Sequence, residues 1–246
     1  MGKIYVVGIG PGGAGQTTPR AEAALAASDA LVGYTTYIDL IRDRYPEKEL
    51  VATPMTTEVE RCKTCRDLAL AGRTAAMVCG GDAGVYGMAG LVYQVCAGCP
   101  EVEIEVIPGV TAATAGAALL GAPLIHDFAA VSLSDALTPW ETIARRLELA
   151  AEGDFVLCLY NPASRRRPDT LRQAAALLLR HRSPDTPCGL ARRVGRPGEE
   201  AKICTLRELG EQQADMFTTV FVGSSQTRVV NGRLVTPRGY EQKGTL

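Results

Sequence analysis

Residues 74–87 read Thr-Ala-Ala-Met-Val-Cys-Gly-Gly-Asp-Ala-Gly-Val-Tyr-Gly, and they are the most informative about the fold class. The first six residues form a short apolar run, which predicts a β-strand buried on both faces, as in a parallel sheet. Glycines and an aspartate follow at once, so the chain must turn sharply where the strand ends. Such loops lie at the carboxyl edge of a parallel sheet, where α/β proteins bind their ligands.

The same order of strand and turn occurs twice more in the first half of the chain. Residues 3–9 are β-branched and aromatic and run into Gly-Ile-Gly-Pro-Gly-Gly, and residues 102–107 end at Pro108-Gly109. Helices are expected after a Thr18-Pro19 cap, over residues 56–72 and over residues 86–97. Strands that alternate with helices predict an α/β fold with a mainly parallel sheet.

In the second half of the chain, the predicted strands and helices follow one another in a different order and spacing. Strands are expected over residues 128–133, 154–160, 188–192, 201–205 and 217–223. The sequence Thr138-Pro139-Trp140-Glu141 matches a capping box with proline at the first helical position, and Pro168 is placed to open a second helix. A glycine- and alanine-rich stretch near residues 116–123 predicts a division into two α/β domains, 1–117 and 118–246.

Composition excludes several classes of partner. The chain has 246 residues and a formal net charge of −1, so it has no general attraction for nucleic acid or for anionic membranes. No run approaches the roughly 18 apolar residues of a membrane helix, and the first residues enter a strand pattern instead of a secretory signal. A cytoplasmic location is therefore expected.

The first glycine loop allows a competing interpretation. Gly8, Gly10 and Gly13 match the G-x-G-x-x-G of nicotinamide-dinucleotide sites. A second strand is expected over residues 30–32, but the acid that such a site needs at the end of this strand is missing, and Pro11 stiffens the loop. A tight strand-to-helix turn is favoured. For the other two loops, Asp82 could hold a ligand or merely organise its own turn, and the Pro108 turn could bind a ligand or simply cap a helix.

Taken together, the three loops resemble the tetrapyrrole methylases, the class III methyltransferases. That family has a G-x-G-P-G loop, a G-G-D-x-x-x-Y-G loop and a P-G-[VI]-T-[SA] turn in this order, and all three occur here at residues 8–12, 80–87 and 108–112. Further segments resemble the subgroup that methylates carbon 17 of precorrin-3B or cobalt-precorrin-3: residues 33–37, 121–128, 132–135, 137–140, 159–162 and 223–228.

The resemblance implies a two-domain tetrapyrrole methylase fold with the cofactor in the inter-domain cleft, a homodimer, and S-adenosyl-L-methionine as cofactor with S-adenosyl-L-homocysteine as product. It implies C-methylation of a small-molecule tetrapyrrole in cobalamin biosynthesis, with ring contraction. Motif matching places the cofactor contacts on Pro11, Gly80, Gly81, Asp82, Val85, Thr111, Ala112, Asn161 and Val194. Asn161 and Val194 match the most variable segments of the family.

Ring contraction requires proton movement, and His126 beside Asp127 is the candidate catalytic pair. An equally weighted alternative is a histidine with a purely structural role. The substrate carries carboxylates around an apolar macrocycle, which suggests arginines and an apolar wall. The predicted substrate residues are Tyr34, Met88, Ser134 and Arg193, with Tyr37, Arg165, Arg166, Arg167, Arg192 and Arg228 as further candidates.

Two C-x-x-C pairs depart from the subgroup pattern. Cys62 and Cys65 form one and Cys96 and Cys99 the other, but their separation is wide for a zinc module, so no metal is predicted. Two alternatives to the C-17 enzyme stay open. One is a tetrapyrrole methylase that modifies another ring carbon, and the other is a cofactor-binding module without turnover.

Overall fold

The computed structural model describes residues 2–164 and 166–244, and the chain divides into two compact units, Met1–Ala112 and Ala113–Leu246. The predicted division between residues 117 and 118 falls inside helix α5 (Ala112–Leu120). The helix goes with the second unit because Gly116 packs directly against Ala191 and Phe221 of that unit. None of the helices formed by the described residues is long and apolar enough to cross a membrane.

The N-terminal unit contains a five-stranded sheet in the order β3-β2-β4-β1-β5, with every neighbouring pair parallel. Its strands are β1 (Lys3–Gly8), β2 (Ala30–Tyr34), β3 (Glu49–Thr53), β4 (Thr74–Cys79) and β5 (Glu103–Ile107). The predicted parallel sheet is therefore confirmed, although β3 was missed. All five carboxyl ends lie at one edge, so the glycine loops after β1 and β4 and the turn after β5 are neighbours.

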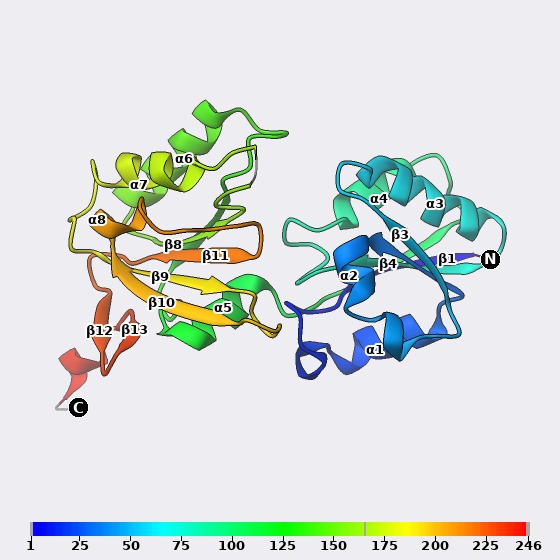
Figure 1. Ribbon diagram of the computed structural model, residues 1–246, viewed down its shortest axis with the longest axis horizontal. Helices are drawn as coiled ribbons and strands as arrows, with labels where there is room; N and C mark the ends of the chain where they lie inside the picture. The colour runs from blue at the N-terminus through cyan, green and yellow to red at the C-terminus, as the bar shows by residue number, and fades with distance from the viewer. Residues whose placement is uncertain (1, 165, 245–246) are drawn as a thin grey trace. The chain divides into compact units, whose positions relative to one another are not determined.

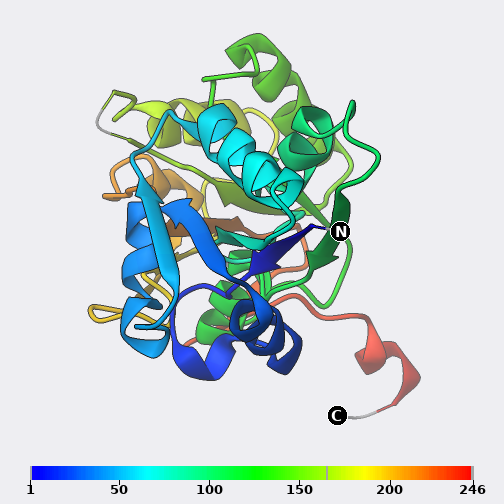
Figure 2. The same cartoon turned by 90° about the vertical axis from the view of Figure 1, so that its right-hand side faces the viewer.

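Helices cover both faces of this sheet (Figures 1 and 2). They are α1 (Pro19–Ala27), α2 (Thr35–Asp39), α3 (Glu58–Leu70) and α4 (Ala89–Val95), with short 3-10 turns η1 (Ala14–Gln16) and η2 (Arg42–Arg44). Alternate residues of one strand enter opposite cores: Ile4 and Val6 pack with α3 and α4, and Val7 packs with α1 and α2. This double burial explains why the strand sequences are continuously apolar.

One predicted helix boundary is wrong and one cap is confirmed. Helix α4 begins at Ala89 instead of Tyr86, because Tyr86 has a positive φ of 52° and belongs to the loop. The Ala89 amide donates to the Ala83 carbonyl and closes that loop at 3.1 Å. At α1, the Thr18 hydroxyl accepts from the Ala21 amide at 3.2 Å, with Pro19 as the first helical residue, as expected.

The C-terminal unit contains a mixed sheet in the order β10-β9-β11-β8-β7, in which only the β7–β8 pair is parallel. The strands are β7 (Phe128–Ser132), β8 (Val156–Tyr160), β9 (Pro187–Arg192), β10 (Glu200–Thr205) and β11 (Thr218–Val222). A smaller sheet joins β6 (Gly121–Ala122) to the hairpin of β12 (Arg228–Val230) and β13 (Arg233–Val235). The hairpin was not predicted.

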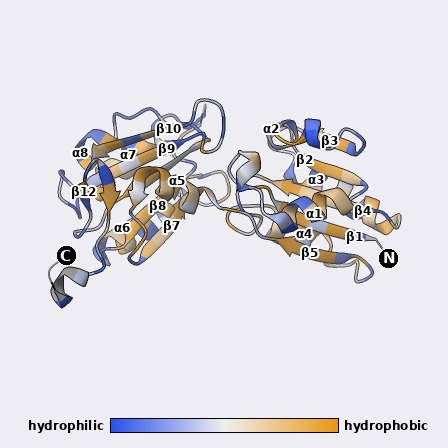
Figure 3. Ribbon diagram, turned by 90° about the horizontal axis from the view of Figure 1, so that it is seen from below, coloured by the Kyte–Doolittle hydropathy of each residue, from blue (hydrophilic) through white to orange (hydrophobic). Residues whose placement is uncertain are grey.

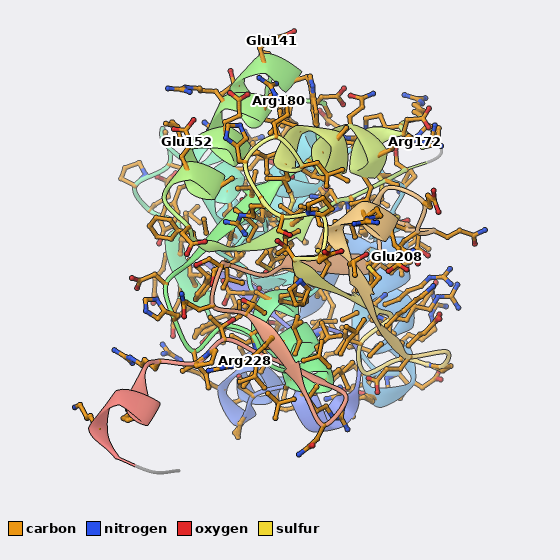
Figure 4. All side chains as sticks on the ribbon, turned by 90° about the vertical axis from the view of Figure 1, so that its left-hand side faces the viewer. Glu141, Glu152, Arg172, Arg180, Glu208 and Arg228 are labelled. Carbon is orange, nitrogen blue, oxygen red and sulfur yellow. The ribbon has the colours of Figure 1, made fainter. Side chains whose placement is uncertain are left out.

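Helices α6 (Trp140–Glu152), α7 (Thr170–Leu178) and α8 (Leu206–Leu209) share one apolar core with the larger sheet. Figure 3 shows the hydrophobic colouring concentrated on the strands, and Figure 4 shows Glu141, Arg172 and Glu208 on the outer side of the helices. The predicted capping box at α6 is wrong: Pro139 itself is the N-cap, and no side chain caps this end. A 3-10 turn, η3 (Tyr240–Lys243), follows the hairpin.

Phe221 is the largest fully buried side chain of the C-terminal unit, and its ring contacts Gly116. Phe221→Ala should lower the free energy of unfolding by about 3–5 kcal/mol, because it leaves a cavity that the sheet cannot close. Urea unfolding followed by circular dichroism measures this. Leu137→Ala is the control, since Leu137 is 98% exposed and its loss should change the value by less than about 0.5 kcal/mol. Equal effects would contradict this packing.

Candidate functional site

The glycine loops that follow β1 and β4, here called the first and second loops, are joined by two hydrogen bonds between their backbones. The Gly10 amide donates to the Gly81 carbonyl at 3.1 Å, and the Gly81 amide donates to the Gly10 carbonyl at 2.7 Å. Both glycines have positive φ, 79° and 70°, which only glycine adopts without strain. The two glycine motifs are therefore required for this pairing.

The turn that follows β5, here called the third loop, packs closely against the backbone of the first two loops. A Cβ at Gly109 would lie 2.3 Å from the Gly81 carbonyl oxygen and 2.5 Å from that of Gly8. A Cβ at Gly8 would lie 2.7 Å from the Gly109 nitrogen. Gly8, Gly10, Gly81 and Gly109 thus form one compact arrangement, here called the glycine junction. It brings together the three loops that the sequence analysis singled out.

Asp82 ties the second loop to the third. Its Oδ1 accepts hydrogen bonds from the amides of Gly84 at 2.7 Å and Val85 at 3.0 Å, and its Oδ2 accepts one from the Gly109 amide at 2.9 Å. A carboxylate that accepts hydrogen bonds from three backbone N–H groups stabilises the conformation of the loops that carry them. Asp82 therefore organises its own turn, which is one of the two alternatives left open for it, while a contact of Asp82 with a ligand stays a prediction.

The geometry also explains why the first loop is unlike a dinucleotide site. The Gly10 amide is already used by Gly81, so it is not free for a pyrophosphate. The loop leads into the 3-10 turn η1, and α1 begins only at Pro19. A dinucleotide loop would instead open directly onto a helix N-terminus.

The other predicted cofactor positions of this unit surround the junction in sequence and differ in exposure. Pro11 is buried, Gly80, Thr111 and Ala112 are half-buried, and Val85 is 38% exposed. A Cβ at Gly81 would meet no atom closer than 3.7 Å, so there is open space beside the Cα of Gly81, although its carbonyl oxygen is close to Gly109. The backbone of these loops is therefore held in place, while Val85 and the open side of Gly81 remain accessible.

Two predicted cofactor positions lie in the C-terminal unit. Asn161 follows β8 with a positive φ of 53°, and its Nδ2 donates to the Ser132 hydroxyl at 3.0 Å. The same hydroxyl accepts from the amide of Ser134, the predicted substrate residue, at 3.3 Å. Val194 follows β9 and is 5% exposed, so its side chain serves packing and its backbone is what a ligand could contact.

The predicted catalytic pair, His126 and Asp127, is exposed, and the two side chains are not hydrogen-bonded to each other. The His126 side chain is 51% exposed, and its Nδ1 lies 3.8 Å from Asp127 Oδ2, beyond hydrogen-bond range. Instead, Nδ1 accepts a hydrogen bond from the Asp127 amide at 2.8 Å. Neutral His126 therefore carries its proton on Nε2, which can donate a hydrogen bond to a ligand, while the lone pair of Nδ1 is already occupied by the Asp127 amide.

An aromatic corner, made of Tyr34, Tyr37 and Gly80, lies at the carboxyl ends of β2 and β4. The two tyrosine rings meet edge to face with centroids 5.4 Å apart. The Tyr37 ring lies so close to Gly80 that a Cβ there would be 2.4 Å from it. Met88, the other apolar residue predicted to contact substrate, is half-buried just before α4.

The candidate arginines separate into two groups. Arg192 donates from Nε and Nη2 to Asp215, and Arg167 pairs with Asp135 at 3.3 Å, so both have partners within the protein. Arg193 is exposed, with a positive φ of 51° directly after β9, and it forms no ion pair with a described residue. Arg165 lies outside the described residues.

The cysteines of the C-x-x-C pairs are free thiols. Cys62, Cys65 and Cys96 are buried, and burial raises the pKa of Cys62 to about 11. No group of three or more histidine, cysteine, aspartate or glutamate side chains within residues 2–164 and 166–244 is arranged to hold a metal ion.

The sequence model of the tetrapyrrole (corrin/porphyrin) methylases matches residues 3–210, so the chain belongs to that family. It is 45% identical to the probable cobalt-factor III C(17)-methyltransferase of Salmonella typhimurium, covering 96% of this chain and 99% of that protein. It is 44% identical to the precorrin-3B C(17)-methyltransferase of a Sinorhizobium species, covering 97% of each. It spans 46% of the cobalt-factor III methyltransferase of Priestia megaterium, to which it is 46% identical.

The fold has a solved counterpart. The crystal structure of the methyltransferase CobJ superposes with a TM-score of 0.91 at 38% identity, over 96% of this chain and all of that chain.

The glycine junction predicts a sharp difference between two glycine substitutions. Gly109→Ala should lower the free energy of unfolding by about 1–3 kcal/mol, since its methyl group meets two backbone carbonyls that cannot move independently. Gly98→Ala should have little effect, because a Cβ there meets nothing within 4 Å. Urea unfolding of both variants tests this, and a tolerated Gly109→Ala would contradict the close approach.

Proposed function

We propose that this chain transfers a methyl group from S-adenosyl-L-methionine to carbon 17 of precorrin-3B or its cobalt-containing counterpart in cobalamin biosynthesis. The supporting observation is the full-length similarity to C(17)-methyltransferases from two bacteria, together with the glycine junction formed by the family's three loops. Ring contraction of the macrocycle, a homodimeric state and a cytoplasmic location belong to the same proposal.

The residues of the N-terminal unit fit the cofactor. Pro11, Gly80, Gly81, Val85, Thr111 and Ala112 would hold it, mainly through backbone groups that the junction keeps in place. S-adenosyl-L-methionine supplies a methyl group on a good sulfonium leaving group, so transfer requires alignment and exclusion of water more than acid or base help. In the C-terminal unit, Asn161 and Val194 are proposed as further contacts.

Asp82 acts in this proposal mainly as a positioning residue. Three backbone amides already occupy its oxygens, so its principal role is to hold the loop 80–87 against Gly109. The order imposed on the backbone before the cofactor binds reduces the entropy that binding would otherwise lose. The open edge of Gly81 can then contact the cofactor without rearrangement.

The remaining predicted residues are assigned to the substrate. Tyr34 and Met88 offer apolar surface to the macrocycle, while Arg193 and Ser134 offer polar contacts to its carboxylates. His126 is the candidate for proton exchange during ring contraction, and it can accept a proton only when its Nδ1 gives up the hydrogen bond from the Asp127 amide. Asp127 contributes through its backbone amide, which fixes the tautomer, and its carboxylate stays 83% exposed.

Asp82→Ala should weaken binding of S-adenosyl-L-homocysteine at least about tenfold, because the loss of three charge-assisted hydrogen bonds releases the loop. Isothermal titration calorimetry measures the affinity. Asp67→Ala is a matched control, since Asp67 is an exposed carboxylate on α3 whose ion-pair partner is its neighbour Arg66. An affinity that Asp82→Ala leaves unchanged would remove Asp82 and its loop from the cofactor site.

His126→Ala should reduce formation of the ring-contracted product about 100-fold while leaving S-adenosyl-L-homocysteine affinity intact, as expected for loss of a general acid–base group. The chain has two histidines, so His181→Ala serves as control. Product formation is followed by mass spectrometry. If turnover is unaltered in His126→Ala, the histidine has a structural role only.

A further inference from the structure

Arg61 is a buried cation on α3 without an acidic partner. Its side chain is 4% exposed, and its Nε donates to the Thr53 hydroxyl at 2.7 Å and its Nη2 to the Pro54 carbonyl at 2.9 Å. No carboxylate among the described residues forms an ion pair with it. The other two cations of the same helix both do, since Lys63 pairs with Glu60 and Arg66 with Asp67.

A buried guanidinium is costly unless its charge and its N–H groups are matched. Arg182, the comparable arginine of the C-terminal unit, is surrounded by four backbone carbonyls, those of Ala150, Phe155, Val222 and Gly223. Arg61 has one carbonyl and one hydroxyl. Its Nη1 has no hydrogen-bond partner among the described residues, which leaves this group to pair with a ligand or with water.

The position of Arg61 connects it to the aromatic corner. Thr53 ends β3 and lies opposite Tyr34 in the β2–β3 register, and the Thr35 hydroxyl donates to the Thr53 carbonyl at 3.1 Å. Arg61, bonded to Thr53, therefore lies next to the strand end that carries Tyr34.

We infer that Arg61 binds a carboxylate on the edge of the tetrapyrrole substrate, an inference that rests on the proposed function. An aromatic surface next to a cation complements an apolar macrocycle with acidic side chains, and Tyr34 of the aromatic corner together with Arg61 offers both. A guanidinium held by Thr53 and Pro54 is oriented before the substrate arrives, and it forms charge-assisted hydrogen bonds with carboxylates. The bound carboxylate would also compensate the buried charge.

The test compares Arg61→Met with Arg66→Met, a change at a half-buried arginine of the same helix that is already paired. For each enzyme, steady-state kinetics give kcat and KM for the tetrapyrrole, and calorimetry gives the affinity for S-adenosyl-L-homocysteine. Arg61→Met should raise the tetrapyrrole KM at least about tenfold, the usual cost of losing a hydrogen-bonded charge partner, and change the S-adenosyl-L-homocysteine affinity less than about twofold. Arg66→Met should behave as wild type.

Arg61→Lys keeps a charge but loses the planar fork, so its KM should rise by a smaller factor, at least about threefold. It decides the question if circular dichroism shows that Arg61→Met is unfolded. An unchanged KM in the folded variant would overturn the inference. So would a parallel loss of S-adenosyl-L-homocysteine affinity, which would mean that Arg61 serves the donor's carboxylate or only the loop after β3. Absence of methyl transfer by the wild-type enzyme would instead refute the proposed function itself.

Discussion

The carboxylate of Asp82 is the interaction on which the rest of the N-terminal site depends. It accepts three backbone amides from two loops, and it lies beside a backbone pairing between Gly10 and Gly81. Glycine is required at positions 8 and 109 because the loops leave no room for a Cβ there, and it is favoured at positions 10 and 81 because both have positive φ. The motif residues therefore first hold the three loops together. Their proposed role in ligand binding follows from the fixed backbone that results.

The two units reach a buried core by different routes. The N-terminal sheet is parallel, is covered on both faces and collects its loops at one edge, which is the usual arrangement for a ligand site. The C-terminal sheet is mixed, and short polar contacts such as that of Asn161 with Ser132 organise the ends of its strands. The proposed methyl transfer asks for alignment more than for acid–base groups, and rigid backbone edges meet that requirement.

The sequence predicts those parts of the fold that are determined by a short local pattern, such as an apolar run or a helix cap. The buried strands were predicted by continuous apolar runs, and the start of α1 by Thr18 and Pro19. Strand β3 was missed because none of its residues is fully buried, and the β12–β13 hairpin was missed because its strands have three residues each and are mostly exposed. The start of α4 was misplaced because a positive φ at Tyr86 leaves no trace in a helical pattern. Arg61 was overlooked because its burial depends on tertiary packing, and the surrounding α3 sequence is strongly polar.

The central claim is that this chain methylates carbon 17 of a cobalamin-pathway tetrapyrrole. Its most direct test is a single-turnover reaction of the purified protein with S-adenosyl-L-methionine carrying a ¹³C-labelled methyl group and precorrin-3B or cobalt-factor III, with the product examined by ¹³C NMR. The account predicts one labelled methyl group, attached to carbon 17. Label on another ring carbon, or no label transferred to either tetrapyrrole, would contradict it.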